Sequence, residues 1–384
     1  MLIRLLPKVS VLTPPFTFTV LMSIAATGSA YADTFEDAVA AYQSGEKVAA
    51  FRLLNQASDE GNDEATFQLA RMLHNGDGVP RNLTKAVALY EQLAKADNPK
   101  GLYSLGLLYV SGDGVPRDIE RAATLMGKSA EAGLVYAQRN YANMLLDGEG
   151  VEKNLTAAAS WMSKAADQGD AVAQRLYGLM LISGNGTEKD EVAGIQLMAK
   201  AATAGDADSQ CFIGRYFNRD GPDHDLKLAV EYYRLSAEQG NDCGQYHYGH
   251  AHQNGIVVER DDAKAELLYR SASDQGYAQA KYALAVLLVD KEGSDARDFQ
   301  AAQALLIDAG KGGIGPSYLL IASLIAKTQG ESGAVDAYAW ALISQASGYV
   351  DEEGLTARLE RHLSSAKTEA ASLRARDLVA EYEL

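Results

Sequence analysis

The sequence repeats at intervals of about 36 residues, and this period limits the fold more than any other feature. A glycine column, an alanine column and a column of Asn or Asp stay in phase along about nine units. The glycine column is Gly61, Gly133, Gly169, Gly205, Gly240, Gly276, Gly312 and Gly348, with Asp97 in its one gap. The alanine column is Ala50, Ala86, Ala122, Ala158, Ala229, Ala265, Ala301 and Ala337, with Gly194 in its gap. Repeats of this length build solenoids, in which each unit packs only on its neighbours.

The columns predict where one helix of each unit begins and ends. The third column is Asn82, Asp118, Asn154, Asp190, Asp225 and Asp261. These side chains can accept a hydrogen bond from a free N–H group in the first turn of a helix. Each column glycine follows about 15 residues later, where the left-handed conformation that ends a helix suits a residue without a Cβ. Asp97 tolerates that conformation better than most residues do. We therefore expect helices such as 83–96.

A second helix precedes this one in each unit, and we call the two helices A and B. Helix A carries small residues that allow close approach of a neighbour: Ala70, Gly106, Ala142, Gly178, Gly214, Gly249 and Ala285. A glycine-rich turn such as 76–80 joins A to B. One antiparallel pair cannot bury its apolar face, whereas a stack of pairs can. We expect an all-α solenoid of about nine helix-turn-helix repeats over residues 33–350. The expected repeats are 33–61, 62–97, 98–133, 134–169, 170–205, 206–240, 241–276, 277–312 and 313–348.

The last segment, 351–384, lacks the period. Its apolar residues are spaced three or four apart, and they are Leu355, Leu359, Leu363, Ala366, Ala370 and Leu373. This spacing indicates a helix with one apolar face. We expect a single C-terminal capping helix over 351–384, with its apolar face on the stack and its charged face in water.

The first 32 residues have the pattern of a cleaved signal peptide. Arg4 and Lys8 are their only charges, an apolar run covers residues 16–26, and Ala30-Tyr31-Ala32 precedes Asp33. An apolar run of this length is shorter than the roughly 20 residues that span a bilayer. We therefore expect cleavage between Ala32 and Asp33 and a periplasmic protein that does not insert in the membrane after its signal is removed.

The expected mature chain is strongly acidic. Without Arg4 and Lys8 it has 33 Lys and Arg against 51 Asp and Glu, a net charge of −18. Such a chain repels nucleic acids and anionic lipid as a whole. We expect no nucleic-acid partner.

The repeat resembles the Sel1-like repeat, a subfamily of the tetratricopeptide-type solenoids. The matching elements are the turn Gly112-x-Gly114-Val115-x-x-Asp118, the stretch Arg121-Ala122-Ala123 and the closing segment Lys164-Ala165-Ala166-x-x-Gly169-x-x-x-Ala173-Gln174. The resemblance implies a right-handed solenoid that acts as a binding scaffold. Secreted bacterial members of this kind regulate sensor kinases, belong to exopolysaccharide export machinery, or interact with host cells. We expect a scaffold that regulates a membrane signalling system, with an adaptor in exopolysaccharide or envelope assembly as the alternative.

Candidate binding residues lie on one face of helix A. With Ala65, Gly101, Ala137, Ala173, Ser209, Gly244 and Ala280 as position 0, the small or apolar positions are 0, 4, 5 and 8. The opposite face on a helical wheel is positions 2, 3, 6 and 9. Its Arg, Tyr and His residues are predicted to bind a protein segment or an acidic glycan, because Arg and Tyr dominate many interfaces. They are Arg71, Tyr103, Arg139, Arg175, Arg215, Tyr246, His250 and Tyr282. The alternative is that these side chains pack on, or form salt bridges with, neighbouring repeats.

Cys211 and Cys243 are the two cysteines, and they lie on helix A of adjacent repeats. An extracytoplasmic setting permits a disulfide between them, but the spacing leaves its formation open. His247 and His250 are three residues apart and share a helix face, and with Cys243 or a turn Asp they could form a zinc or copper site. The simpler interpretation is packing, so we expect no metal and no cofactor.

No catalytic residue is predicted. The chain lacks a G-x-S-x-G segment and an H-E-x-x-H segment, and Gly127-Lys128-Ser129 has no glycine five residues before it and lies within an expected helix. The sequence therefore favours a binding protein over an enzyme, with an enzyme acting on cell wall or glycan as a minor alternative.

Overall fold

The computed structural model describes residues 30–290 and 296–384, and every regular element in these ranges is helical. The predicted signal peptide lies outside the described residues except for its last three, with which the first helix begins. Among the described helices, none has both the length and the apolar character needed to cross a membrane. The chain divides into two compact units, which meet in sequence at Gly205 and Asp206. We describe each unit by itself.

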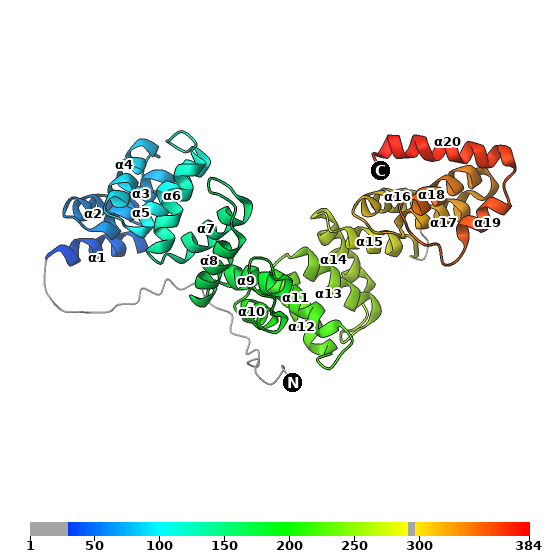
Figure 1. Cartoon of the computed structure of the whole chain (residues 1–384), viewed down its shortest axis with the longest axis horizontal. Coiled ribbons are helices and arrows are strands. Elements are labelled where there is room, and N and C mark those ends of the chain that lie inside the picture. The colour runs from blue at the N-terminus through cyan, green and yellow to red at the C-terminus, as the bar shows by residue number, and fades with distance from the viewer. Residues whose placement is uncertain (1–29, 291–295) are drawn as a thin grey trace. The chain divides into compact units, whose positions relative to one another are not determined.

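The first unit, described over 30–205, consists of five antiparallel helix pairs in chain order (Figure 1). Its helices are α1 (Ala30–Gln43), α2 (Lys47–Asp59), α3 (Asp63–Asn75), α4 (Leu83–Lys95), α5 (Pro99–Ser111), α6 (Ile119–Glu131), α7 (Val135–Asp147), α8 (Leu155–Asp167), α9 (Ala171–Ser183) and α10 (Glu191–Thr203). Each helix contacts the one before and the one after it, which is the packing expected of a solenoid.

The second unit, 206–384, adds four helix pairs and two further helices. Its helices are α11 (Ala207–Asn218), α12 (Leu226–Glu238), α13 (Asp242–Asn254), α14 (Asp262–Asp274), α15 (Ala278–Asp290), α16 (Ala296–Lys311), α17 (Ser317–Gln329), the short 3₁₀ helix η2 (Gly330–Gly333), α18 (Ala334–Ala346), α19 (Leu355–Arg361) and α20 (Ser365–Tyr382). The described part of the chain thus contains nine pairs, which confirms the predicted all-α array.

The predicted helix caps are all confirmed. At the start of each B helix from α4 to α14, the Asn or Asp side chain accepts a hydrogen bond from the backbone N–H three residues later. In α6, for example, the distance from Arg121 N to Asp118 Oδ1 is 2.9 Å. Helix A uses the same device, because Asn62, Asp170 and Asn241 cap α3, α9 and α13.

The glycine column ends the B helices with one exception. Asp97 has φ of 52°, as expected of a residue in the place of a column glycine. In the eighth repeat the left-handed residue is Gly313 rather than the predicted Gly312. The predicted column alanine of this repeat, Ala301, is also wrong by one residue, because Ala302 is fully buried and Ala301 is exposed. Helix B of this repeat is therefore displaced by one residue relative to the period.

The glycines among the small residues of helix A lie against large, buried side chains of helix B. Gly106, Gly178, Gly214 and Gly249 contact Met126, Met198, Tyr233 and Tyr269, respectively. Helices α9 and α10 approach each other closely, because a Cβ on Gly194 would lie 2.6 Å from the Gly178 carbonyl oxygen. This contact explains why glycine interrupts the alanine column at position 194.

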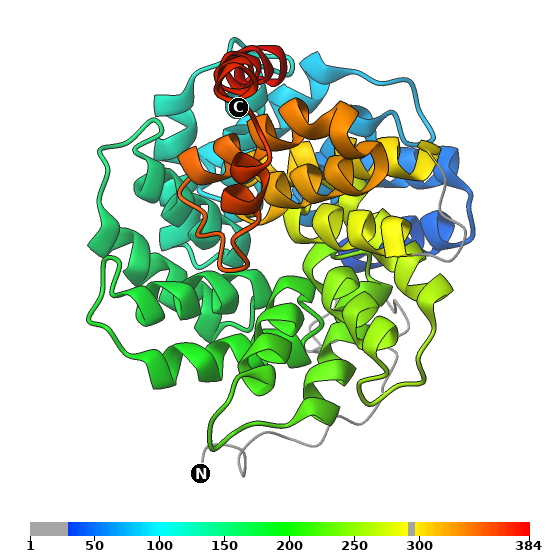
Figure 2. The ribbon, with the colours of Figure 1, turned by 90° about the vertical axis from the view of Figure 1, so that its right-hand side faces the viewer.

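The end of the chain differs from the prediction, because 351–384 contains two helices rather than one. Ser364 caps α20 by accepting a hydrogen bond from the Lys367 N–H, and this new start changes the buried face. Ala371 and Leu378 are buried, while the predicted core residue Leu373 is 55% exposed. Figure 2 shows α20, the red helix at the C-terminus, which packs against α18.

Candidate partner-binding face

The A helices have the two faces that the wheel predicts. In α3 and α5 every residue at positions 0, 4, 5 and 8 is buried. In α7 and α9 the exceptions are Tyr141 and Tyr177, which are half-buried. Positions 2, 3, 6 and 9 of these four helices are all exposed or half-buried. We call this set of positions on α3, α5, α7 and α9 the helix-A ribbon. The positions that face solvent are thus the ones that the sequence selects.

The helix-A ribbon contains no carboxylate, although the chain has 51 Asp and Glu residues. Its charged residues are Arg71, Arg139 and Arg175, and His74 is its one histidine. On α3, α5, α7 and α9, acidic side chains are confined to the helix ends, as Asp63 and Glu64 are on α3. The ribbon is therefore a locally basic surface on a chain whose formal net charge is −16.

Arg71 and Tyr103 contact other side chains of the ribbon. The Arg71 guanidinium lies 5.9 Å from the centre of the Phe67 ring and donates to Gln68 Oε1 at 3.0 Å. The Tyr103 hydroxyl accepts a hydrogen bond from Asn140 Nδ2 at 2.9 Å, which connects α5 to α7. Burial raises the pKa of the Tyr103 phenol, so it remains an uncharged group. Arg71 remains exposed at the ribbon surface.

Arg139 follows the alternative that the sequence left open, a salt bridge to the neighbouring repeat. Its Nη1 lies 2.9 Å and 2.7 Å from the two carboxylate oxygens of Asp170. The Asp170 side chain is 6% exposed, and it also caps α9 by accepting from Ala173 N. Arg139 therefore connects α7 to the start of α9, which is a structural role. Arg175 is half-buried at the equivalent position of α9.

Exposed apolar side chains on the ribbon were missing from the sequence-based selection. Leu107, Val110 and Leu179 are 40%, 37% and 39% exposed, and they occupy positions 6 and 9 of α5 and α9. Leu146 and Ile182 are half-buried at position 9 of α7 and α9. The signal was present in the sequence, because large apolar residues at solvent-facing positions mark binding surfaces. A search restricted to Arg, Tyr and His overlooked them.

In the second unit, the selected residue Tyr246 belongs to a cluster of aromatic rings centred on α13. Tyr246 packs against Tyr269 and Tyr277, with ring centroids 5.8 Å and 5.4 Å apart. Burial raises the pKa of the Tyr246 phenol. Arg215 and His250 are exposed at position 6 of α11 and α13. These rings fill space between repeats, so Tyr246 has the packing role that the sequence left open.

Tyr282 lies apart from this cluster. It is half-buried on α15 and packs against the core of α15 to α20. Burial and the nearby Tyr349 raise the pKa of its phenol.

His247 lies at the centre of the aromatic cluster. Its ring stacks on Tyr233 with centroids 4.5 Å apart and meets Tyr246 edge-on at 4.9 Å. Burial, together with the charges of Arg215 and His250, lowers the pKa of His247 from 6.5 to about 4. The imidazole is therefore neutral at physiological pH.

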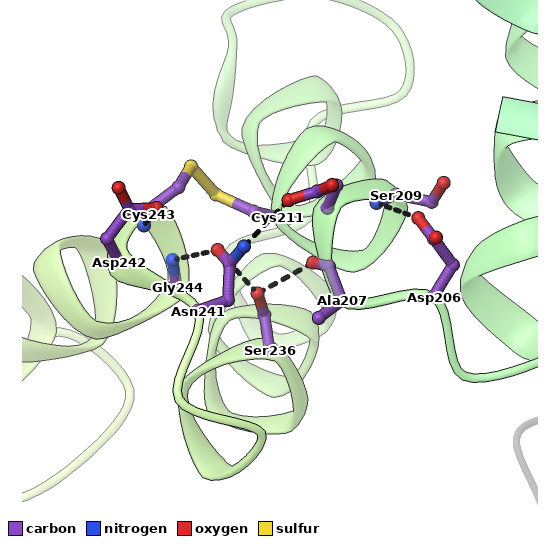
Figure 3. Close-up of a disulfide and its surroundings, with 10 residues drawn as sticks. Asp206, Ala207, Ser209, Cys211, Ser236, Asn241, Asp242, Cys243 and Gly244 are labelled. Atoms are coloured by element: carbon purple, nitrogen blue, oxygen red, sulfur yellow. Dashed lines mark hydrogen bonds between the residues drawn. A yellow bond between two sulfur atoms is a disulfide. The ribbon is translucent and has the colours of Figure 1, made fainter. Parts of the chain in front are cut away.

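Cys211 and Cys243 form a disulfide that joins α11 to α13, with Cα atoms 6.1 Å apart (Figure 3). A polar network beside it fixes the two helix starts. Asn241 caps α13 at Gly244 N and donates to Asp208 at 2.8 Å. The Ser236 hydroxyl donates to the Ala207 carbonyl oxygen at 2.7 Å. Closing a loop of 32 residues with a disulfide stabilises a fold by about 3–4 kcal/mol in the chain-entropy model.

The metal alternative considered from the sequence, His247 with His250, does not match the geometry. Within the described residues, the group with closely spaced donor atoms is Cys211, Cys243 and His247, without His250. His252 is buried and its Nδ1 lies 3.2 Å from the Glu259 carbonyl oxygen, so it has a packing role.

Ser129 in the Gly127-Lys128-Ser129 segment is a helix residue with a structural contact. It lies within α6, and its hydroxyl donates to the Pro99 carbonyl oxygen at 2.7 Å. The same contact recurs three units further on between Ser236 and Ala207, so the serine connects helix B to the start of helix A within one repeat.

Comparison with known families identifies the repeat. A family model described as the Sel1 repeat matches residues 63–98, 99–134, 135–170, 171–206, 207–241 and 244–277. Among curated proteins the comparison found no match.

Two solved structures are similar in fold. One is a protective antigen present in uropathogenic Escherichia coli strains, which displays an SLR fold. It is 23% identical, has a TM-score of 0.67, and the match covers 92% of this chain and 84% of that one. The other is a Sel1 repeat protein from Oxalobacter formigenes. It is 28% identical, has a TM-score of 0.57, and the match covers 67% of this chain and 76% of that one.

Proposed function

The chain belongs to the Sel1 repeat family, whose repeats mediate protein–protein interaction, and from this premise we propose that its helix-A ribbon binds a segment of a partner protein outside the cytoplasm. The partner in this proposal is the outer domain of a membrane sensor, which the protein regulates. The signal-peptide pattern of residues 1–32 supports the compartment. The Cys211–Cys243 disulfide is also typical of proteins in oxidising compartments.

The observation that carries the proposal is the exposure of Leu107, Val110 and Leu179 on a face without carboxylates. Apolar side chains exposed in this way cost solubility unless a partner covers them. Arg71 lies on the same ribbon, so a partner carboxylate would find an exposed guanidinium at one end of the apolar strip. The chemistry fits a peptide segment that combines apolar side chains with acidic ones.

The experiment replaces the apolar strip without touching the core. We expect Leu107→Gln together with Leu179→Gln to weaken partner binding by about tenfold or more, because each exposed anchor contributes on the order of 1 kcal/mol. Glutamine is a good helix former, so the helical content should be unchanged. The measurement is cross-linked capture from a periplasmic extract, followed by titration of the captured sensor domain.

A matched control is available on the B helices. Leu267 on α14 and Val192 on α10 are 67% and 49% exposed, and neither belongs to an A helix. Leu267→Gln with Val192→Gln should bind as the unmodified chain does. Equal binding by the ribbon variant and this control would remove the ribbon as the binding surface. Capture of export or envelope-assembly components in place of a sensor would contradict the regulatory role.

Arg139 is unsuitable for this test, because its replacement removes the contact with Asp170 and disturbs the cap of α9. A loss of binding in an Arg139 variant would not separate recognition from folding. Arg71 is the better charge test, since its hydrogen bond and its ring contact lie within α3.

A further inference from the structure

The donor atoms of Cys211, Cys243 and His247 lie within 4.8 Å of one another. Two helices supply them, because Cys211 lies on α11 and the other two residues are spaced four apart on α13. Residues four apart share one face of a helix, so the thiol of Cys243 and the imidazole of His247 point to the same side. In the oxidised chain the two sulfurs are bonded to each other, and the imidazole lies beside them.

The imidazole is held in place without a hydrogen bond. Its ring lies between Tyr233 and Tyr246 as described above, and within the described residues no hydrogen bond involves either ring nitrogen. A half-buried imidazole ordinarily has a polar partner for at least one nitrogen. The ring nitrogens of His247 are therefore oriented by packing and remain available to a ligand.

We propose that reduction of the Cys211–Cys243 disulfide creates a binding site for a soft divalent metal ion, with Zn²⁺ as the natural occupant and Cys211, Cys243 and His247 as its ligands. Two thiolates and one imidazole are donors that zinc prefers. Zinc ligand distances of about 2.0–2.3 Å place neighbouring donor atoms roughly 3.5–4 Å apart. The three donor atoms already lie within 4.8 Å of one another. Once the disulfide bond is broken, small side-chain rotations are therefore sufficient to reach the zinc geometry. Water or a group from a partner would occupy the fourth coordination position of the metal ion.

The redox step requires a two-electron reductant, which in the protein's surroundings is a dithiol. The reductant transfers two electrons and two protons to the disulfide, which yields two thiols, while the reductant closes its own disulfide. Metal binding then displaces the two thiol protons and joins the ion to both thiolates and to a neutral His247 nitrogen. Attack occurs at Cys243, which is half-buried, since Cys211 is only 1% exposed. The oxidised and metal-bound states exclude each other, so the site reports the redox state of its surroundings.

The test uses the full chain, reduced with a trialkylphosphine under nitrogen and titrated with Co²⁺ as the probe. We expect one Co²⁺ per chain, a thiolate-to-cobalt charge-transfer band and the visible bands of a tetrahedral site, all displaced by Zn²⁺. The oxidised chain should show none of these bands. Circular dichroism of the reduced chain should retain the helical spectrum, because the rest of the solenoid does not depend on this bond.

Matched variants identify the ligands. His247→Gln should weaken cobalt binding at least tenfold, whereas His250→Gln, on the same helix but outside the donor group, should leave it unchanged. Cys243→Ser should abolish the charge-transfer band. The proposal is overturned if the reduced chain gives no such band, if His247→Gln binds cobalt as tightly as the unmodified chain, or if reduction alone destroys the helical spectrum.

Discussion

At the scale of single residues, Val257 occupies a place where four earlier repeats have glycine. The glycines are Gly78, Gly114, Gly150 and Gly186, the second glycine of each turn between helices A and B, and all have positive φ. Val257 has φ of 65° and is 51% exposed. A β-branched residue in this region clashes with its own backbone, so the turn of the seventh repeat stores strain.

Replacing Val257 by glycine should therefore stabilise the protein. The left-handed conformation costs an ordinary residue about 1–2 kcal/mol, and the greater freedom of glycine in the unfolded chain offsets part of the gain. We expect a net stabilisation of about 1 kcal/mol, measured as a shift of the urea midpoint. Gly186→Val, the reverse change in an earlier repeat, should destabilise, because its Cβ would overlap the Leu155 carbonyl oxygen. A lower midpoint for Val257→Gly would show that its turn is relaxed.

The lowered pKa of His247 makes stability depend on pH. Its pKa is about 4 in the folded chain and 6.5 in the unfolded chain, so the unfolded state binds the proton first as the pH falls. The stability from this group is fully present above about pH 6.5 and is lost as the pH falls toward 4. Between about pH 7.5 and pH 5 the loss is about 2 kcal/mol.

The measurement is urea unfolding at these two pH values for the oxidised chain and for His247→Gln. The variant should lose less stability over this interval, by about the same 2 kcal/mol, while carboxylates affect both proteins alike. Identical pH dependence in the two proteins would show that the imidazole is solvated.

At the scale of helices, the sequence predicted most positions because local chemistry decides them. Side chains such as Asp118 and Asn154 cap their helices wherever the period places them. Two features of the helices were not predicted from the sequence. The one-residue displacement at Ala302 depends on how α16 packs on α15, and the break at Ser364 depends on the contact of α20 with α18. Both follow from tertiary packing, which a repeat period cannot encode.

The small column of helix A predicts opposite effects for one substitution at two glycines. A Cβ on Gly106 would lie 3.1 Å from the Met126 Cε atom, the mobile end of a flexible side chain. A Cβ on Gly214 would lie 2.6 Å from the Tyr233 ring, which is buried and cannot move aside. We expect Gly106→Ala to be neutral or to stabilise by up to about 1 kcal/mol through helix propensity.

Gly214→Ala should destabilise by about 1–3 kcal/mol, because it overpacks the interface between α11 and α12. Thermal unfolding of the two variants side by side tests the pair. A stabilising effect at both sites would mean that α11 can shift away from α12 without cost.

At the scale of the whole molecule, each helix contacts mainly its neighbours in the chain, so a disturbance should remain local. Hydrogen exchange of Gly214→Ala should reveal faster opening of α11 to α14 and unchanged protection of α3 to α6. A uniform loss of protection over both units would contradict this expectation and indicate one cooperative unit.

The candidate binding face could be predicted only in part. The period identified which side of helix A faces solvent, and the structure confirms that side for α3 to α9. Which side chains remain accessible there depends on contacts between repeats. Arg139 is engaged by Asp170, whereas Leu107 and Leu179 remain 40% and 39% exposed. These differences arise from neighbours about 30 residues away, and a single helical wheel contains no information about them.

The polar contacts between successive repeats have a consequence for how such a chain changes in evolution. Asn98 reaches Asp63 and Arg117 reaches Glu149, each over roughly one period. A duplicated or deleted whole repeat would give each remaining group an equivalent partner, whereas a shorter insertion would leave several without one. The molecule can therefore lengthen or shorten its interaction surface in whole-repeat steps, and genetic variation in repeat number should be tolerated where variation within a repeat is not.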